Sequence, residues 1–126
     1  MRRTSSGVRF HRFAYCSSSL RYKTDIAPFS SGLDLVARLR PIAFTWKEGG
    51  ARDLGLGAEE VAAIEPLLVT RNASGQVEGV KYDRVAVVLL NAVKEQQAQI
   101  ARLGDEVRAL RQQLEGQRTA NERSSP

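Results

Sequence analysis

The sequence has few of the residues from which disulfide frameworks and metal sites are built. Its 126 residues include one cysteine, Cys16, and one histidine, His11. A single cysteine excludes an internal disulfide, so packing or association must hold the fold together. His11 lies in a basic N-terminal stretch with no predicted structure around it, and we therefore expect no metal site and no cofactor.

Long hydrophobic runs are missing as well. No stretch approaches the roughly 18 consecutive apolar residues of a membrane span, and no apolar signal core follows the first arginines. The sequence therefore predicts a soluble protein without a membrane partner, and it leaves the compartment open.

Acidic residues are absent from positions 1–24, although the chain contains 14 of them and carries a net charge of +5. Phe10, Phe13 and Tyr15 lie among the basic residues of this stretch, but they match a nucleic-acid-binding pattern only loosely. We interpret residues 1–17 as a flexible leader or the remnant of an upstream region, and nucleic-acid binding as the weaker alternative. The basic side chains are Arg2, Arg3, Arg9, Arg12, Arg21 and Lys23.

Residues 18–82 show the patterns of one small α+β domain. Short amphipathic helices are predicted from about residue 30 to Pro41 and over 58–64. Alternation predicts a strand over 42–46, followed by a turn at 47–50. Residues 67–70 and 77–82 flank an Asn- and Gly-containing loop, which is typical of a β-hairpin.

From Asp83, a predicted helix cap, apolar residues recur at alternating steps of three and four. This pattern predicts a coiled-coil helix over 83–115, followed by a disordered tail over 116–126. No segment of matching length exists inside the chain to cover the stripe, so we expect a homo-oligomer. We call the following residues the seam: Leu89, Val93, Gln96, Ile100, Leu103, Val107, Leu110 and Leu114.

The oligomer number is less well determined by the pattern. With Val93 at position a, the a positions are mostly β-branched and the d positions mostly leucine, which favours two strands. Gln96 is the one polar d position, and a buried polar residue of this kind often fixes the register.

Ser18 and Lys23 are five residues apart at the start of the domain. A lysine kept neutral by burial can act as the base that activates a serine nucleophile. The spacing alone is weak evidence, because both residue types are common on protein surfaces.

The order of landmarks along the chain resembles the peptidase S74 family, the endosialidase-type intramolecular chaperone domain. The resemblance spans roughly residues 17–115. Its landmarks are Ser18-x-x-Arg21-x-Lys23, Asp25-Ile26, a short helix, Pro41 to Trp46, Gly55-x-x-Ala58-Glu59-Glu60-Val61, Pro66, Val69, Val80-x-Tyr82 and the heptad helix. The chain departs from the family at Ser19, Tyr22, Gly57 and Glu59, where Asp, Leu, a bulky apolar residue and Gln are common.

The resemblance implies a trimeric folding clamp of the kind found at the C-termini of phage tail spikes and tail fibres. It implies that Ser18 is a nucleophile, that Lys23 is its base, and that the chain cuts itself between Ser17 and Ser18. The implied partners are two further copies and an upstream fibre or stalk region, with a place on a virion or cell surface. The alternative is a structural trimerisation module that does not cut itself.

Overall fold

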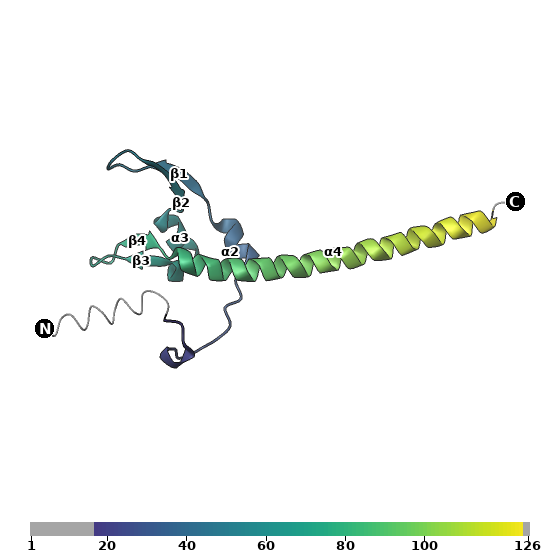
Figure 1. Ribbon diagram of the computed structural model, residues 1–126, viewed down its shortest axis with the longest axis horizontal. Helices are drawn as coiled ribbons and strands as arrows, with labels where there is room; N and C mark the ends of the chain where they lie inside the picture. Colours follow the sequence, from purple (N-terminus) through teal and green to yellow (C-terminus); the bar gives the residue numbers. More distant parts are fainter. Residues whose placement is uncertain (1–16, 125–126) are drawn as a thin grey trace.

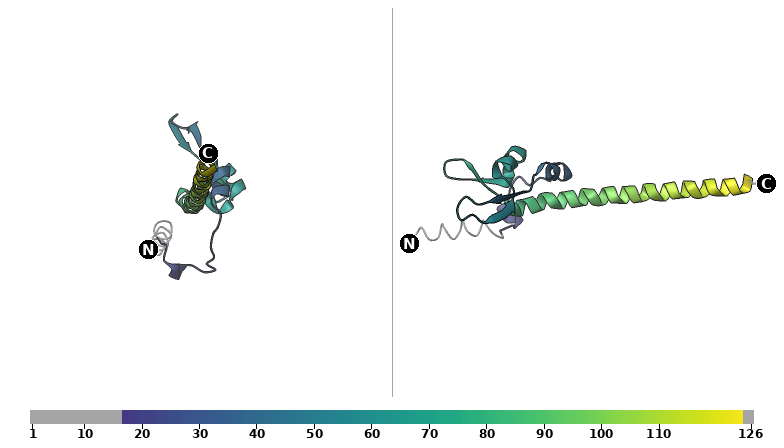
Figure 2. Two further views of the ribbon diagram at one scale, coloured as in Figure 1. Left: turned by 90° about the vertical axis from the view of Figure 1, so that its right-hand side faces the viewer. Right: turned by 90° about the horizontal axis from the view of Figure 1, so that it is seen from above.

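One long helix organises the fold. The computed structural model describes residues 17–124, and within them α4 (Tyr82–Ser124) accounts for 43 residues. The remaining elements gather around the N-terminal part of α4, and the rest of the helix extends alone into solvent (Figure 1). The two perpendicular views show the same arrangement (Figure 2). We call residues 32–81 the head and residues 17–31 the arm.

The head combines short helices with two antiparallel hairpins, which confirms the predicted α+β class. Its helical elements are α2 (Leu33–Arg38), α3 (Ala58–Ile64) and the 3₁₀ turn η2 (Pro66–Leu68). The first hairpin pairs β1 (Ile42–Thr45) with β2 (Arg52–Gly55), and the second pairs β3 (Val69–Arg71) with β4 (Val77–Val80).

The loop of the second hairpin explains why this hairpin could be predicted. The Asn72 side-chain oxygen accepts hydrogen bonds from the backbone N–H groups of Ser74 (2.9 Å) and Gln76 (3.0 Å). Gly75 has a φ of +83°, which glycine adopts without steric cost. The first hairpin was predicted only in part, because β2 reads Arg-Asp-Leu-Gly and lacks the alternation of a half-buried strand.

The hydrophobic core is small and depends on α4. Its most buried side chains are Val61 of α3 and Val88 of α4, each 1% exposed. Leu35, Leu68 and Val69 complete the buried cluster, and Ala92 of α4 is also buried. Because so little apolar surface is enclosed, a single copy of this domain gains only a modest stabilisation from burial.

Both ends of α4 differ from the prediction. The helix begins at Tyr82, so Asp83 is its second residue and not its cap. At the other end the helix continues to Ser124, through most of the segment predicted as a disordered tail (116–126). The apolar stripe does stop at Leu114, but no proline interrupts the helix before Pro126 and most of the intervening residues tolerate helical backbone.

Gly32 joins the arm to the head at a point where the chain passes close to α4. A Cβ at this position would overlap the Glu95 carboxylate and lie 3.0 Å from backbone atoms of Asn91 and Ala92. We expect Gly32→Ala to lower the free energy of unfolding by about 1–3 kcal/mol, the usual cost of overpacking, as measured by chemical denaturation. The matched control is Gly104→Ala in exposed α4, where a Cβ meets nothing within 4 Å.

The two glycine substitutions should act in opposite directions. Alanine at position 104 should stabilise the helix by about 1 kcal/mol, because glycine is a poor helix former. Equal effects of the two variants would show that the close approach at Gly32 is not important for stability.

Candidate functional site

A single 3₁₀ turn, η1 (Leu20–Tyr22), brings the two ends of the Ser-Lys motif together. The Ser19 hydroxyl caps this turn by accepting from the Arg21 backbone N–H at 3.3 Å, and it also accepts from the Arg21 guanidinium at 3.1 Å. The Lys23 backbone N–H closes the turn by donating to the Leu20 carbonyl at 3.0 Å. Ser19 is a departure from the resembled family, but serine is as good an N-cap as aspartate.

The Lys23 ammonium donates a hydrogen bond to the Ser18 hydroxyl, with 3.0 Å between Nζ and Oγ. This is the separation at which a lysine can exchange a proton with a serine nucleophile. Ser17, whose carbonyl carbon belongs to the peptide bond in question, directly precedes Ser18 and is half-buried. The sequence-predicted pair is therefore within reach of proton transfer, and it lies next to the bond that the resemblance implies is cut.

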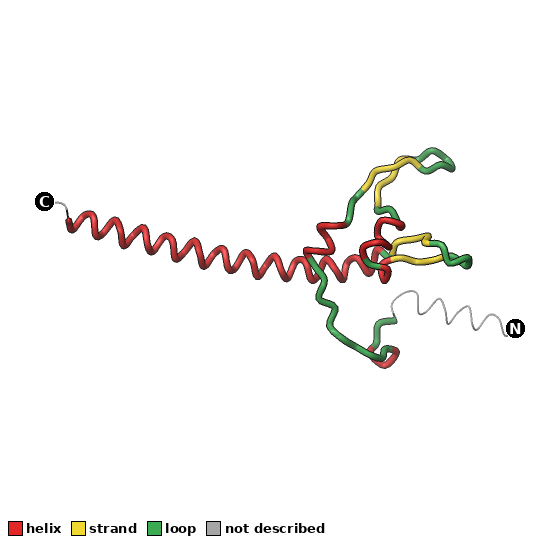
Figure 3. The backbone as a smooth tube through the Cα atoms, turned by 180° about the vertical axis from the view of Figure 1, so that it is seen from behind, coloured by secondary structure: helices red, strands yellow, loops and turns green. Residues whose placement is uncertain are grey.

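The pair lies on the arm, away from the head. Residues 20–30 are all exposed, including the apolar side chains of Leu20 (67%) and Ile26 (65%). Figure 3 shows η1 and the following loop set apart from both hairpins. A lysine base and an acyl intermediate both favour a site from which water is excluded. A single copy of the chain does not provide that exclusion at Ser18 and Lys23.

Two polar side chains of α4 hold the near end of the arm. The Asn91 amide donates to the backbone carbonyls of Phe29 (2.6 Å) and Ser31 (3.0 Å). The Glu95 carboxylate accepts from the Leu33 backbone N–H at 3.2 Å. Sequence reasoning missed these anchors because they join segments about 60 residues apart and follow no local pattern.

The seam is exposed along its whole length. Its apolar residues are 45–61% exposed, and Gln96 is exposed too. The helix packs on the head through other positions, chiefly Val88 and Ala92. The first third of α4 is thus apolar on two faces, one covered by the head and one covered by nothing in a single copy.

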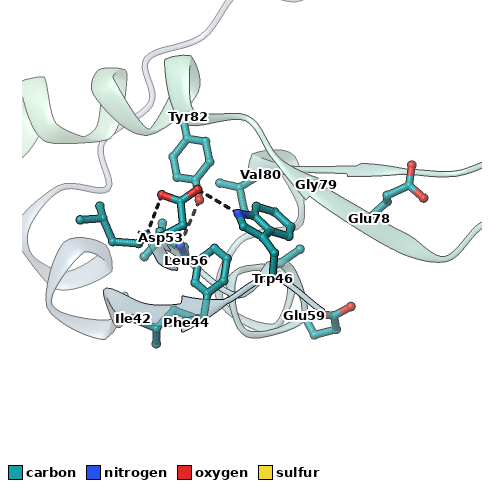
Figure 4. Close-up of a pocket in the computed structure, with 13 residues that line it drawn as sticks. Ile42, Phe44, Trp46, Asp53, Leu56, Glu59, Glu78, Gly79, Val80 and Tyr82 are labelled. Atoms are coloured by element: carbon teal, nitrogen blue, oxygen red, sulfur yellow. Dashed lines mark hydrogen bonds between the residues drawn. The ribbon is translucent and has the colours of Figure 1, made fainter. Parts of the chain in front are cut away.

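A groove between the two hairpins was not predicted from the sequence. It encloses about 540 Å³ and is lined on its aromatic side by Phe44, Trp46 and Tyr82 (Figure 4). The Tyr82 hydroxyl accepts from the Leu56 backbone N–H at 2.9 Å, which ties the residue after β2 to the start of α4. Phe44 of β1 and Trp46, which directly follows the strand, are two residues apart, an alternation visible in the sequence, but only the tertiary structure brings Tyr82 beside them.

The Asp53 carboxylate is fixed in the same groove. It accepts from the Leu54 backbone N–H at 2.8 Å and from the Trp46 indole N–H at 3.1 Å. These two hydrogen bonds, the backbone one foremost, lower the pKa of Asp53 below its usual value. The carboxylate therefore stays ionised at neutral pH and holds the indole ring in place.

Comparison with known proteins identifies the part of the chain that carries the Ser-Lys pair. Residues 18–70 match the model of the peptidase S74 family, described as the chaperone of endosialidase. This segment is similar to that family. The chaperone-of-endosialidase match begins at Ser18, includes Lys23 and ends within β3, so it is shorter than the resemblance over 17–115 that the sequence landmarks suggested.

The match supports an intramolecular chaperone-type segment over residues 18–70. No curated protein matches the chain. Among the described residues, no helix combines the length and the apolar character that a membrane span requires.

Proposed function

We propose that the chain is an intramolecular chaperone and trimerisation domain that cuts its own Ser17–Ser18 bond once it has assembled. The observation that carries this proposal is the 3.0 Å hydrogen bond between Lys23 and Ser18 inside the chaperone-of-endosialidase segment. The proposed parts are a leader (1–17), a chaperone core (18–82) and the oligomerisation helix that follows it.

The chemistry requires only groups of the chain and water. Lys23, as a neutral amine, takes the hydroxyl proton of Ser18 while Oγ attacks the Ser17 carbonyl carbon. The C–N bond then breaks, the proton passes to the Ser18 nitrogen, and an ester joins the Ser17 carbonyl to Ser18 Oγ. Hydrolysis of this ester releases residues 1–17 with a carboxylate end. Because nucleophile and carbonyl are neighbours in one chain, no substrate pocket is needed.

Assembly would supply the exclusion of water that a single copy lacks at Ser18 and Lys23. Association of three exposed seams would bring neighbouring heads and arms together and exclude water from Ser18 and Lys23. Three copies are preferred to two on the family resemblance, although the residues at the a and d positions favour two. Cutting after assembly would then remove the clamp from an upstream fibre or stalk region, which would be stabilised kinetically because it could not retrace its folding path.

The second candidate is a trimerisation module that does not cut itself. The observation that favours it is the exposure of Ser18 and Lys23, since a solvated lysine is a poor base. In both candidates the chain would act as part of a fibre-like protein on a virion or cell surface.

Intact mass separates these candidates. We expect the purified protein to lack residues 1–17 and to begin at Ser18, as read by mass spectrometry and N-terminal sequencing. Light scattering on the same sample should give the mass of three chains. A full-length mass in a confirmed trimer would eliminate self-cleavage and leave the structural module.

A further inference from the structure

The groove between the hairpins is acidic in a basic protein. Its lining contains three carboxylates, those of Asp53, Glu59 and Glu78, and no lysine, arginine or histidine. The chain as a whole carries a net charge of +5. The local excess of negative charge therefore favours a ligand with positive charge.

Two of these carboxylates are available to a ligand. Asp53 is occupied by Trp46 and Leu54, but Glu59 and Glu78 form no ion pair with any other residue between 17 and 124. Glu59 projects from the start of α3 and Glu78 from β4, so they mark two sides of the groove (Figure 4).

Beside the carboxylates lies an aromatic surface that is only partly covered. Trp46 is 52% exposed and Tyr82 54% exposed, and Phe44 packs edge-on against Trp46 with 5.0 Å between ring centres. Exposed aromatic rings attract both apolar side chains and the flat guanidinium group of arginine. A peptide with basic and aromatic side chains would match the charge and the aromatic lining of this groove.

The chain itself contains such a peptide. Residues 8–15 read Val-Arg-Phe-His-Arg-Phe-Ala-Tyr, with two arginines, three aromatic residues and no acid. We propose that the groove binds this segment of the same chain, with Arg9 and Arg12 paired to Glu59 and Glu78 and with aromatic side chains against Trp46 and Tyr82. The segment lies directly upstream of Ser17–Ser18, on the side that cleavage would release.

Tethering makes this weak contact effective. A segment joined to the protein by a short linker has a local concentration on the order of millimolar, so exposed ion pairs and ring contacts hold it more effectively than they would hold a separate peptide. Once the bond after Ser17 is cut, that local concentration is lost and the peptide dissociates. The docking does not depend on the proposed function, because it holds in an uncut chain whether or not cutting ever occurs.

Trp46 is the only tryptophan of the chain and reports on the groove directly. The experiment uses the full-length Ser18→Ala variant, in which the leader stays attached, and measures acrylamide quenching of tryptophan fluorescence. Adding Arg9→Glu and Arg12→Glu should raise the quenching constant by about twofold or more, because Trp46 returns to its 52% exposure. Arg2→Glu with Arg3→Glu makes the same charge change outside the segment and should leave quenching unaltered.

A charge exchange tests the pairing itself. Glu59→Arg with Glu78→Arg should expose Trp46 in the same way, and combining these changes with Arg9→Glu and Arg12→Glu should restore its protection. Quenching that is equal with and without the leader substitutions would overturn the proposal. Protection of Trp46 that does not respond to the leader substitutions but is lost on dilution would also overturn the proposal. It would show that a second copy occupies the groove, because Tyr82 lies one heptad before Leu89 on the seam side.

Discussion

Lys23→Arg should leave the Ser17–Ser18 bond uncut in an otherwise normal assembly. Arginine keeps the positive charge and the hydrogen-bond donors that Lys23 presents to Ser18 at 3.0 Å, but a guanidinium group does not give up its proton in proteins. A positioned base contributes about 10²- to 10⁴-fold to a proton transfer, and we expect a rate loss at least that large. The fraction of cut chain is measured over time by intact mass.

Two further variants define what this result means. Ser18→Ala should stop cleavage equally, because the nucleophile is gone, whereas Lys47→Arg makes the same substitution in the exposed turn after β1 and should have no effect. Light scattering and circular dichroism should be unchanged in all three variants. If the Lys23→Arg variant cut itself at the normal rate, another group would have to take the Ser18 proton. Lys23 would then be only a hydrogen-bond partner of Ser18.

Local sequence patterns predicted the elements of this fold better than their ends. The heptad repeat specified α4, and the alternation after Pro41 specified β1, because both periods are set by backbone geometry. The end of the apolar stripe at Leu114 does not mark the end of the helix, because helical backbone requires only compatible residues and hydrogen bonds, and α4 continues to Ser124.

In the candidate site, too, contacts between residues close in sequence could be predicted, and contacts between distant residues could not. Ser18 and Lys23 could be paired from the sequence because one turn joins them and family landmarks surround them. Two other contacts could not be predicted from the sequence: the hydrogen bond from the Asn91 amide to the Phe29 carbonyl, and the position of Tyr82 beside Trp46. Each depends on how separate elements pack. Such contacts leave no periodic trace in the sequence.

The two faces of α4 link stability to assembly. Val88 and Ala92 complete the core of the head, so the helix must form for the head to fold. On the other face, Leu89 and Val93 remain exposed, and partner helices would cover them in the proposed oligomer. Folding of the head and association of the seam would then stabilise the same helix, and each should strengthen the other.

Ile100→Asp with Leu103→Asp should convert the assembly to single chains and abolish cleavage. Both side chains lie in the middle of the seam, 61% and 58% exposed in one copy, and both would be buried between helices in the oligomer. Loss of each buried apolar side chain costs about 2–5 kcal/mol per copy, and the introduced carboxylates add mutual repulsion. Sedimentation or light scattering gives the mass, and mass spectrometry of the same sample gives the extent of cutting.

The control for this prediction is Ala98→Asp with Ala109→Asp, which places the same charges on the opposite side of α4 and should preserve both assembly and cleavage. The seam substitutions lie far along the helix from η1, so they leave the 3.0 Å contact between Lys23 and Ser18 intact. A single chain that still cuts itself would therefore separate the chemistry from assembly. Persistent trimers would instead place the main contacts near the heads, where Val87 and Leu90 at the start of α4 are also exposed.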